Sequence, residues 1–333
     1  MTVELGIIGA GAIAREHVAA YGRLPGAAVR AVVDHHPERA RALAALAGAP
    51  RWGTDLALVL DDPEVRAVDI CTPPDSHAGL AVAAAGRGKA IHVEKPVTLS
   101  VAEFDAMADA ASRAGIPLMV GQTARFQPVN LELRRALAED VVGPLRALHV
   151  TWYAGHVWPN GWRGWQLDPA RCGGHLVHNG VHALDLAVWL FGDRPVRVFA
   201  RGFQSFAPAM PTPDSFHIVV RFAGGGMALL EISYALRERG DALRRVVAVG
   251  ERGTLAHGTE GEPRLASDAA RLPSPSLEDA MVAQLRHWLA VVRGEEEPIV
   301  RYEEVRETLA AALAAQESFD TGRAVSLAAV ARG

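Results

Sequence analysis

The sequence is poor in cysteine and has no long apolar run. Among its 333 residues, only Cys71 and Cys172 are cysteines, and they lie too far apart for a paired metal-ligand motif. We interpret both as reduced thiols, so redox chemistry would have to come from a bound cofactor. Gly, Asp, Arg or His interrupts each apolar run well before the ~18 residues that a membrane helix needs, which predicts no membrane span.

The sequence also has no strong excess of one charge, no repeats and no stretch that resembles a leader peptide. The net charge is -4, and basic residues are mixed with acidic ones, which argues against nucleic acid as a partner. No repeat with a period of about 20 to 50 residues is visible. The chain enters a strand-like segment directly after Met1-Thr2, without a basic stretch or a cleavage site, which favours a cytoplasmic protein.

The chain does contain enough apolar material for two cores, because half of its residues are apolar. In the first part, strand-like runs alternate with helical patterns, and this alternation predicts a doubly wound parallel sheet of the α/β class. We therefore expect a dinucleotide-binding Rossmann domain over residues 1–121. The expected strands are 3–8, 28–33, 67–70, 90–93 and 117–120, and the expected helices are 13–23, 37–47, 77–86 and 101–114.

Beyond residue 121 the strands follow one another. This order predicts a C-terminal α+β domain over residues 122–333 with an open, mainly antiparallel sheet that binds substrate, and a helix within 300–320 that packs back on the first domain. The exposed face of such a sheet predicts a homodimer or homotetramer. Strands are expected at 145–152, 196–203, 216–222, 227–234 and 244–249, and helices at 128–138, 176–191, 277–292 and 302–316.

A glycine-rich loop joins the first expected strand to the first helix. Gly9, Gly11 and Ala14 give the pattern Gly-x-Gly-x-x-Gly/Ala, in which the first glycine allows a tight turn and the second lets backbone approach a pyrophosphate. The N-terminus of the helix then faces the anion, so Ala12 and Ile13 are candidate contacts as well.

Asp34 ends the second expected strand, about 20 residues after the loop, where a carboxylate can accept hydrogen bonds from both ribose hydroxyls. It would repel a 2′-phosphate, and His35 rather than an arginine follows it, so NAD is favoured over NADP. Arg39 or Arg41 could still reach a phosphate. The alternative role of Asp34 is to cap the helix that starts at Pro37.

Three further motifs follow the glycine loop. They are Thr72-Pro73-Pro74 with His77, the triplet Glu94-Lys95-Pro96, and the segment Gly173-Gly174-His175-Leu176-Val177-His178-Asn179-Gly180-Val181-His182. In this order the four motifs resemble the Gfo/Idh/MocA family of oxidoreductases, and the resemblance runs over nearly the whole chain. Many members have a cis bond before the proline of the triplet. The resemblance implies a cofactor lined by Thr72, Pro73, His77, Glu94 and Gln122.

The resemblance further implies that Lys95 lies beside the nicotinamide and hydrogen-bonds the reacting oxygen. A cation there would stabilise negative charge on that oxygen while hydride leaves carbon. Taken alone, Lys95 could be a surface lysine. His182 falls on the family's histidine, which resembles a general acid/base. The chain departs from the family four residues earlier, where His178 stands in place of a common aspartate.

Residues 178 and 182 are four apart, so on one helix two imidazoles would face the same pocket. Either could relay the proton while the other orients the substrate, and Asn179 could add a neutral hydrogen bond. A metal site built from His175, His178, His182 and Asp185 is a further alternative. We favour no metal, because the dinucleotide motifs already account for redox chemistry.

An aromatic loop over residues 152–165 holds more than half of the seven tryptophans. Ring faces suit the apolar side of a sugar, so Trp165, His156, Arg163 and Asn179 are candidate substrate contacts. Arg125 is another, since Arg125 and the next residue resemble a basic-aromatic pair of the family. The aromatic loop could instead form a subunit contact or pack on the sheet. Arg125 could instead belong to a structural ion pair.

These features predict an NAD-dependent oxidoreductase that transfers hydride between the nicotinamide and a secondary hydroxyl of a sugar, glycoside or inositol-like polyol. Two alternatives stay open. Some relatives keep NAD bound and cleave a glycosidic bond, and others have become non-catalytic sensors of sugar and dinucleotide. The presence of Lys95 and His182 weighs against a sensor.

Overall fold

The structure is a computed structural model and describes residues 1–155, 164–204, 210, 212–236, 241–260 and 264–328. The chain forms two compact units, each built from two stretches. The first unit comprises Met1–Phe126 and Glu278–Arg306, and the second comprises Gln127–Leu277 and Glu307–Gly333. The stretch that returns to the first unit therefore contains α10 (Ala280–Arg293) and only the first residues of α11 (Tyr302–Thr321).

The first unit contains a parallel sheet of six strands in the order β3-β2-β1-β4-β5-β6. All residues of β4, β5 and β6 are buried, as expected for a sheet that is covered on both faces. The doubly wound parallel sheet is confirmed, while the short strand β3 was not predicted. The strands are β1 (Val3–Ile8), β2 (Ala27–Val33), β3 (Arg51–Gly53), β4 (Ala67–Ile70), β5 (Ala90–Val93) and β6 (Leu118–Val120).

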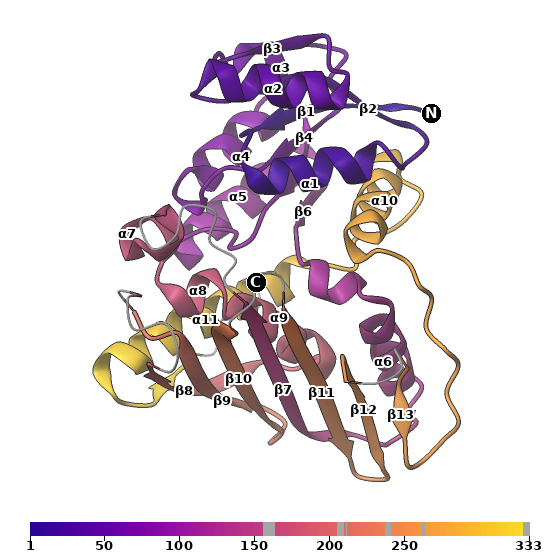
Figure 1. Ribbon diagram of the computed structural model, residues 1–333, viewed down its shortest axis with the longest axis vertical. Helices are drawn as coiled ribbons and strands as arrows, with labels where there is room; N and C mark the ends of the chain where they lie inside the picture. Colours follow the sequence, from indigo (N-terminus) through magenta and orange to yellow (C-terminus); the bar gives the residue numbers. More distant parts are fainter. Residues whose placement is uncertain (156–163, 205–209, 211, 237–240, 261–263, 329–333) are drawn as a thin grey trace. The chain divides into compact units, whose positions relative to one another are not determined.

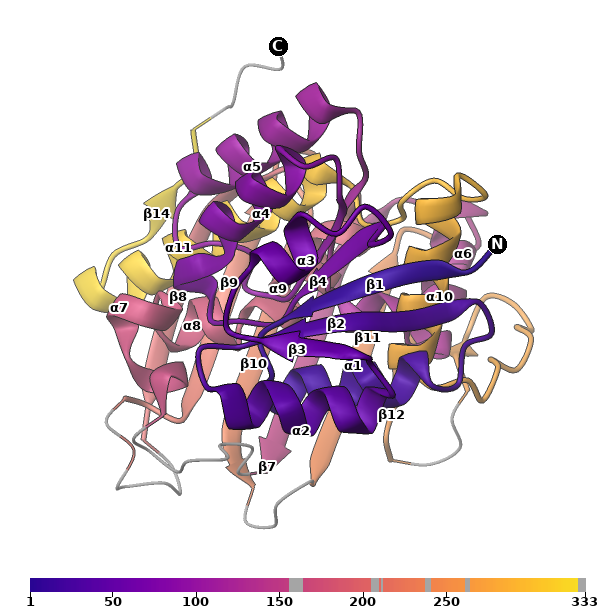
Figure 2. The same ribbon diagram turned by 90° about the horizontal axis from the view of Figure 1, so that it is seen from above.

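Helices cover both faces of this sheet. In Figure 2, α1 and α2 lie on one face and α4 and α5 on the other, and α10 packs against α1. Since the strand order runs outward in both directions from β1 and β4, the loops after these strands border the crevice in which such sheets bind ligands. The helices are α1 (Ala12–Tyr21), α2 (Pro37–Ala47), α3 (Ala57–Leu60), α4 (His77–Ala85) and α5 (Val101–Ala114).

The second unit is built on an eight-stranded sheet in the order β13-β12-β11-β7-β10-β9-β8-β14, whose strands lie side by side in Figure 1. Among the described strands of this sheet, only β7 and β10 pair in parallel, so the sheet is mixed and mainly antiparallel, as predicted. The strands are β7 (Leu145–Gly155), β8 (Pro195–Phe203), β9 (Ser215–Phe222), β10 (Met227–Leu236), β11 (Ala242–Gly250), β12 (Thr254–Gly258), β13 (Ala266–Ser267) and β14 (Val325–Ser326).

The helices of this unit are α6 (Pro128–Ala138), α7 (Pro169–Cys172), α8 (His175–His178), α9 (Val181–Phe191) and most of α11. Helix α9 packs on β7 and β10, and its residues from Ala183 to Leu190 are all buried. Side chains of the strands alternate between a buried and a more exposed face, which is the period that a half-covered sheet requires. Among the described residues, no helix has the length and apolar character needed to cross a membrane.

Candidate active site

The glycine loop after β1 has the geometry of an anion-binding turn. Gly9 has a φ of +95°, and a Cβ there would lie 2.9 Å from the backbone of Cys71, so only glycine fits. Gly11 is the N-cap of α1 and contributes no side-chain cap, which leaves N–H groups of the first turn for a ligand. In the part of the chain that the structure describes, no atom beyond the adjoining backbone lies within 4 Å of a Cβ built on Gly11. This open space beside uncapped N–H groups fits a pyrophosphate.

Asp34 stands at the end of β2 and connects the glycine loop to the turn before α2. Its Oδ2 accepts a hydrogen bond from Ala10 N at 2.7 Å, and its Oδ1 accepts one from His36 N at 2.8 Å. His36 rather than Asp34 is the N-cap of α2, so the alternative that Asp34 caps this helix is wrong. The Asp34 carboxylate is only partly buried, while His35 is exposed.

His77 fixes the Thr72-Pro73 loop that follows β4. Its ring is fully buried, with Nε2 at 2.7 Å from Thr72 O and Nδ1 at 3.0 Å from Val97 O. The Ser76 hydroxyl donates to Thr72 Oγ1 at 2.7 Å. Burial lowers the pKa of His77, and the two backbone carbonyls oppose this shift. Since both ring nitrogens are engaged with the backbone, this histidine supports the loop rather than offering a free nitrogen to a cofactor.

Glu94 and Lys95 follow β5, and the peptide bond between Lys95 and Pro96 is cis, as the resemblance implies. Glu94 is buried, and its Oε2 accepts a hydrogen bond from Lys95 N at 3.2 Å. Loss of hydration lowers the pKa of the Lys95 ammonium, and the Glu94 carboxylate opposes this shift. A lysine with a lowered pKa beside a carboxylate is suited to exchange a proton or to stabilise a developing anion.

Lysine is rare in this chain, and the two lysines have different surroundings. Lys89 donates to Asp62 O at 2.6 Å and to Val65 O at 2.8 Å, and it ties the turn before β4 to the turn before β5. Lys95 stands at the opposite, carboxyl end of β5. Only Lys95 is therefore placed at the end of the sheet where α/β folds bind ligands.

Arg125 and Gln122 lie after β6. Arg125 is fully buried, forms an ion pair with Glu304, and donates to Ile299 O at 3.2 Å. These contacts support the alternative that Arg125 is a structural ion pair. Gln122 is buried, and its Oε1 meets no donor within the described part of the chain. This oxygen is available to accept a hydrogen bond from a ligand.

In the second unit, the expected single helix over 176–191 is two helices. Helix α8 ends at His178 and α9 begins at Val181. A Cβ at Gly180 would lie 2.3 Å from Leu176 O, so glycine is required between the two helices. The expectation that His178 and His182 share one helix face is therefore wrong. His182 stacks on Trp152 with ring centres 5.3 Å apart, and His178 meets Trp165 edge-on at 5.1 Å.

His175 is a core residue rather than a ligand. Its ring lies 5.3 Å from Phe216 and 5.1 Å from Tyr234, and burial lowers its pKa to about 4 against a smaller opposing effect of Asp214. Asp185 is fully buried and accepts from Thr308 Oγ1 at 3.4 Å. The metal alternative required His175, Asp185 and the two other histidines to converge, and among the described residues these four do not form a cluster of ligand atoms.

The aromatic loop falls mostly outside the described residues, including His156 and Arg163. Its described ends are Trp152 in β7 and Trp165 in a short 3₁₀ helix. Trp152 is 8% exposed, with His182 stacked on it and the Arg244 guanidinium 4.0 Å from its ring centre. Asn179, between the two helices, is buried. Arg244 was not predicted as part of the site, since nothing in the sequence links its strand to Trp152.

A buried cluster in the first unit was also missed. His17, Asp69 and His92 have ligand atoms within 4.8 Å of one another and are fully buried. The 2.8 and 2.7 Å separations between the two imidazoles and Asp69 are hydrogen-bond lengths, shorter than the about 3.3 Å between ligands of tetrahedral zinc. A signal was present in the sequence, because Asp69 is a charged residue inside an otherwise apolar buried strand.

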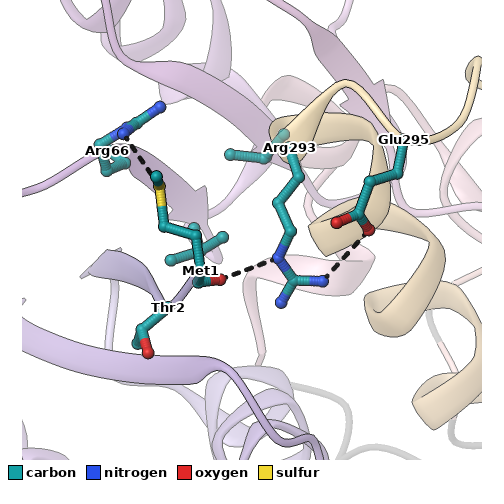
Figure 3. A pocket seen from close by; sticks show the side chains of 7 residues that line it. Met1, Thr2, Arg66, Arg293 and Glu295 are labelled. Atoms are coloured by element: carbon teal, nitrogen blue, oxygen red, sulfur yellow. Dashed lines mark hydrogen bonds and ion pairs between the residues drawn. The ribbon is translucent and has the colours of Figure 1, made fainter.

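One pocket of the first unit lies away from these groups. It is shown in Figure 3, where Arg293 reaches Met1 O at 3.0 Å and Arg66 faces the Met1 sulfur. Met1 and Arg66 precede β1 and β4, so this pocket lies at the amino ends of the strands. The glycine loop, the Thr72 loop and Lys95 all lie at the carboxyl ends, and the pocket is therefore not part of the candidate site.

Comparisons with known proteins agree with this geometry. Residues 3–122 match a family described as "Oxidoreductase family, NAD-binding Rossmann fold", and residues 130–256 match the GFO/IDH/MocA C-terminal domain. D-apiose dehydrogenase of Paraburkholderia graminis is 31% identical over 96% of this chain and 88% of its own length. Inositol 2-dehydrogenase of Rhizobium meliloti is 30% identical over 77% of this chain and 76% of its own length.

A solved structure with the same arrangement is that of a putative myo-inositol dehydrogenase from Sinorhizobium meliloti. It superposes with a TM-score of 0.83 at 28% identity and covers 98% of this chain and 100% of that chain. Both units thus have counterparts in proteins described as dehydrogenases of sugars or inositols.

Proposed function

The chain belongs to the Gfo/Idh/MocA family of NAD-dependent oxidoreductases, and on this premise we propose that it oxidises a secondary hydroxyl of a sugar, glycoside or inositol-like polyol, or runs the reverse reduction. The names of the D-apiose and inositol dehydrogenases support this class of substrate. The observation that carries the proposal is Lys95, a lysine of lowered pKa held beside Glu94 at the carboxyl end of β5.

The first unit has the groups to hold the dinucleotide. The uncapped N-terminus of α1 and the open space at Gly11 fit the pyrophosphate, and Asp34 can accept hydrogen bonds from the adenosine ribose. A negative carboxylate at that place disfavours the 2′-phosphate of NADP. Bound NAD would supply the acceptor for the hydride.

Lys95 and a histidine of the second unit divide the remaining chemistry. Lys95 Nζ donates a hydrogen bond to the carbinol oxygen and stabilises the negative charge that develops on it. The hydrogen on the carbinol carbon departs with both bonding electrons. His182 takes the hydroxyl proton, so that the carbinol becomes a carbonyl. His178, Asn179 and Trp165 orient the substrate.

A panel of sugars, glycosides and inositols tests the proposal, with NADH absorbance as the readout. Wild-type protein should reduce NAD with at least one member. Lys95→Met should lower kcat by about 10³-fold, because removing a group that stabilises transition-state charge typically has this effect. NAD binding by the variant, measured by calorimetry, should persist and serves as the control. Unchanged turnover by Lys95→Met would refute the proposed role.

The uncovered face of the second sheet supports self-association, and we propose a homodimer or homotetramer through it. Met227, Leu229 and Val249 are 52%, 39% and 39% exposed, and they lie around a shallow groove with Ala147 and Val219. A second copy of the same sheet would bury this apolar face.

Light scattering tests the assembly. Leu229→Glu should convert the oligomer to a monomer, because it places a charge in the centre of the apolar face. Leu46→Glu is the matched control, since Leu46 is 56% exposed on α2 of the other unit. A wild-type monomer at working concentration would refute the proposal.

The two cysteines also fit the proposed cytoplasmic location. Cys71 and Cys172 are both buried free thiols, and burial raises the pKa of each. Such thiols are compatible with a reducing compartment.

A further inference from the structure

His17, a residue without a role in the proposed chemistry, lies between two buried carboxylates of the first unit. It projects from α1, one turn after the glycine loop. Its Nδ1 donates to Asp69 Oδ2 at 2.8 Å, and its Nε2 lies 3.2 Å from Glu94 Oε1. His17 and Asp69 are fully buried and Glu94 nearly so. Neither carboxylate could remain ionised there without a nearby cation.

The surroundings of His17 favour a charged ring. Each nitrogen of His17 faces a carboxylate oxygen, and only an imidazolium carries a proton on both nitrogens. Burial lowers the pKa of His17, but Asp69 and Cys71 outweigh this effect and bring it well above its usual value. Asp69 accepts three more hydrogen bonds, from Tyr21 at 3.1 Å, from His92 at 2.7 Å and from the Cys71 thiol at 3.6 Å, which stabilise its charge.

Glu94 is held at both of its oxygens. Oε1 faces His17, and Oε2 accepts from the backbone N–H of Lys95 at 3.2 Å. A Cβ on Gly121 would lie 2.6 Å from Oε1, so the glycine after β6 leaves room for this carboxylate. Burial raises the pKa of Glu94, but His17, and to a smaller extent Lys95 and His92, hold it below its usual value. The carboxylate next to Lys95 is therefore ionised and fixed in position.

We propose that His17 is a positioning residue of the reaction, which as an imidazolium fixes Glu94 beside Lys95 and balances part of its negative charge. The proposal rests on the proposed function, in which Lys95 acts on the substrate hydroxyl. Asp69, His17, Glu94 and Lys95 then form a line of alternating charges. The Glu94 carboxylate interacts with two cations, His17 and Lys95. The imidazolium of His17 therefore offsets part of the stabilisation that Glu94 gives to the Lys95 ammonium.

Loss of the His17 charge has a defined consequence. Lys95 titrates at a pH where Glu94 is ionised. Loss of the His17 imidazolium removes a cation that repels Lys95 and leaves the Glu94 carboxylate unopposed. This change favours the charged ammonium. His17→Gln should therefore raise the pKa of Lys95 by about 0.5 to 1 pH unit.

His92 provides a matched control. It is also fully buried, and its Nδ1 also donates to Asp69, but its Nε2 lies 3.4 Å from Gln284 Nε2 instead of facing Glu94. His92→Gln disturbs the same carboxylate with the same substitution and leaves the contact to Glu94 in place. His92 acts on Glu94 without contacting it, so His92→Gln should raise the pKa of Lys95 less than His17→Gln does.

The scarcity of lysine makes the experiment direct. Protein labelled with [¹³Cε]lysine gives signals from Lys89 and Lys95 only, and Lys89→Arg assigns them. The Lys95 signal is titrated by NMR in wild type, His17→Gln and His92→Gln. A clearly larger rise in the pKa of Lys95 in His17→Gln than in His92→Gln supports the proposal. No rise, or an equal rise in His92→Gln, would overturn it.

Two provisions keep the test decisive. If His17→Gln does not fold, Asp69→Asn replaces it, because loss of that carboxylate should leave His17 uncharged and raise the pKa of Lys95 in the same direction. The titration needs neither substrate nor turnover. Retained turnover in Lys95→Met would refute the proposed function, whereas an unchanged Lys95 titration in His17→Gln would refute the role of His17 alone.

Discussion

Two groups of histidines, one in each unit, have different surroundings. In the first unit, His17 and His92 donate to the Asp69 carboxylate, and His17 also faces Glu94. In the second unit, His175 lies between Phe216 and Tyr234. The neighbouring His178 and His182 lie against tryptophans.

The difference decides which charge an imidazole carries. The pKa of His17 is raised above its ordinary value of 6.5, whereas that of His175 is lowered to about 4. His17 therefore contributes stability that is present below pH 6.5 and lost as the pH rises through its folded-state pKa. His175 is neutral when folded, so stability is lost as the pH falls from about 6.5 towards about 4. Buried His17 of the first unit is thus an ion, and buried His175 of the second unit is a polar core residue.

The largest expected effect comes from breaking the charge network of the first unit. Asp69→Leu leaves buried imidazoles without their carboxylate and should lower the free energy of unfolding in urea by about 3 to 5 kcal/mol. Asp105→Ala, which breaks the partly exposed pair with Arg306, is the control and should cost less than about 1 kcal/mol. Similar losses in the two variants would contradict the network.

The acid sensitivity of the second unit is the next test. Between pH 7 and pH 5, wild type should lose about 2 kcal/mol more unfolding free energy than His175→Phe, because the unfolded histidine gains a proton that the folded one does not. Urea unfolding at both pH values measures this difference. Equal losses of unfolding free energy in the two proteins would show that His175 does not cause the loss of stability in acid.

A third test concerns the backbone site of the first unit. Gly11→Ala should weaken NAD binding by about tenfold or more, because its methyl group occupies the space where the pyrophosphate approaches. The stability of the free protein should change little, since that methyl group meets no protein atom. Gly9→Ala is the comparison, and its contact with Cys71 together with a positive φ should destabilise the free protein. Calorimetry and thermal unfolding separate the two outcomes.

The smallest effect is expected at the aromatic contacts of the second unit. Trp152→Phe shortens the ring that lies between His182 and Arg244 and should reduce the unfolding free energy by about 1 kcal/mol. The loss should not depend on salt, in contrast to that of an ion pair. A loss of unfolding free energy as large as that of Asp69→Leu would contradict the proposed difference between the two groups of histidines.

Local signals explain which parts of the fold could be predicted. The helices over 37–47 and 101–114 have the predicted bounds, because Pro37 starts the first, Ser100 caps the second, and Gly48 and Gly115 end them in the left-handed conformation. The break at Gly180 was missed, since the apolar pattern continues across it. The parallel pairing of β7 with β10 was missed because it joins strands that are distant in sequence.

The same reasoning applies to the candidate site. Motifs that act through the backbone, such as Gly9 and Gly11, can be identified from spacing alone. The line from Asp69 through His17 to Glu94 depends on three elements that meet only in the folded unit. A sequence shows that Asp69 is out of place in an apolar strand, but it does not show which cation lies next to it.

The proposed hydride transfer is tested most directly by following one hydrogen atom. A polyol that reduces NAD is prepared with deuterium on its carbinol carbon, and the cofactor is examined by mass spectrometry after the reaction. Our account predicts that deuterium appears in NADH in stoichiometric amount with the carbonyl product, and that Lys95→Met slows the transfer. Substrate cleavage without net deuterium in the cofactor, or NADH that carries only solvent hydrogen, would contradict it.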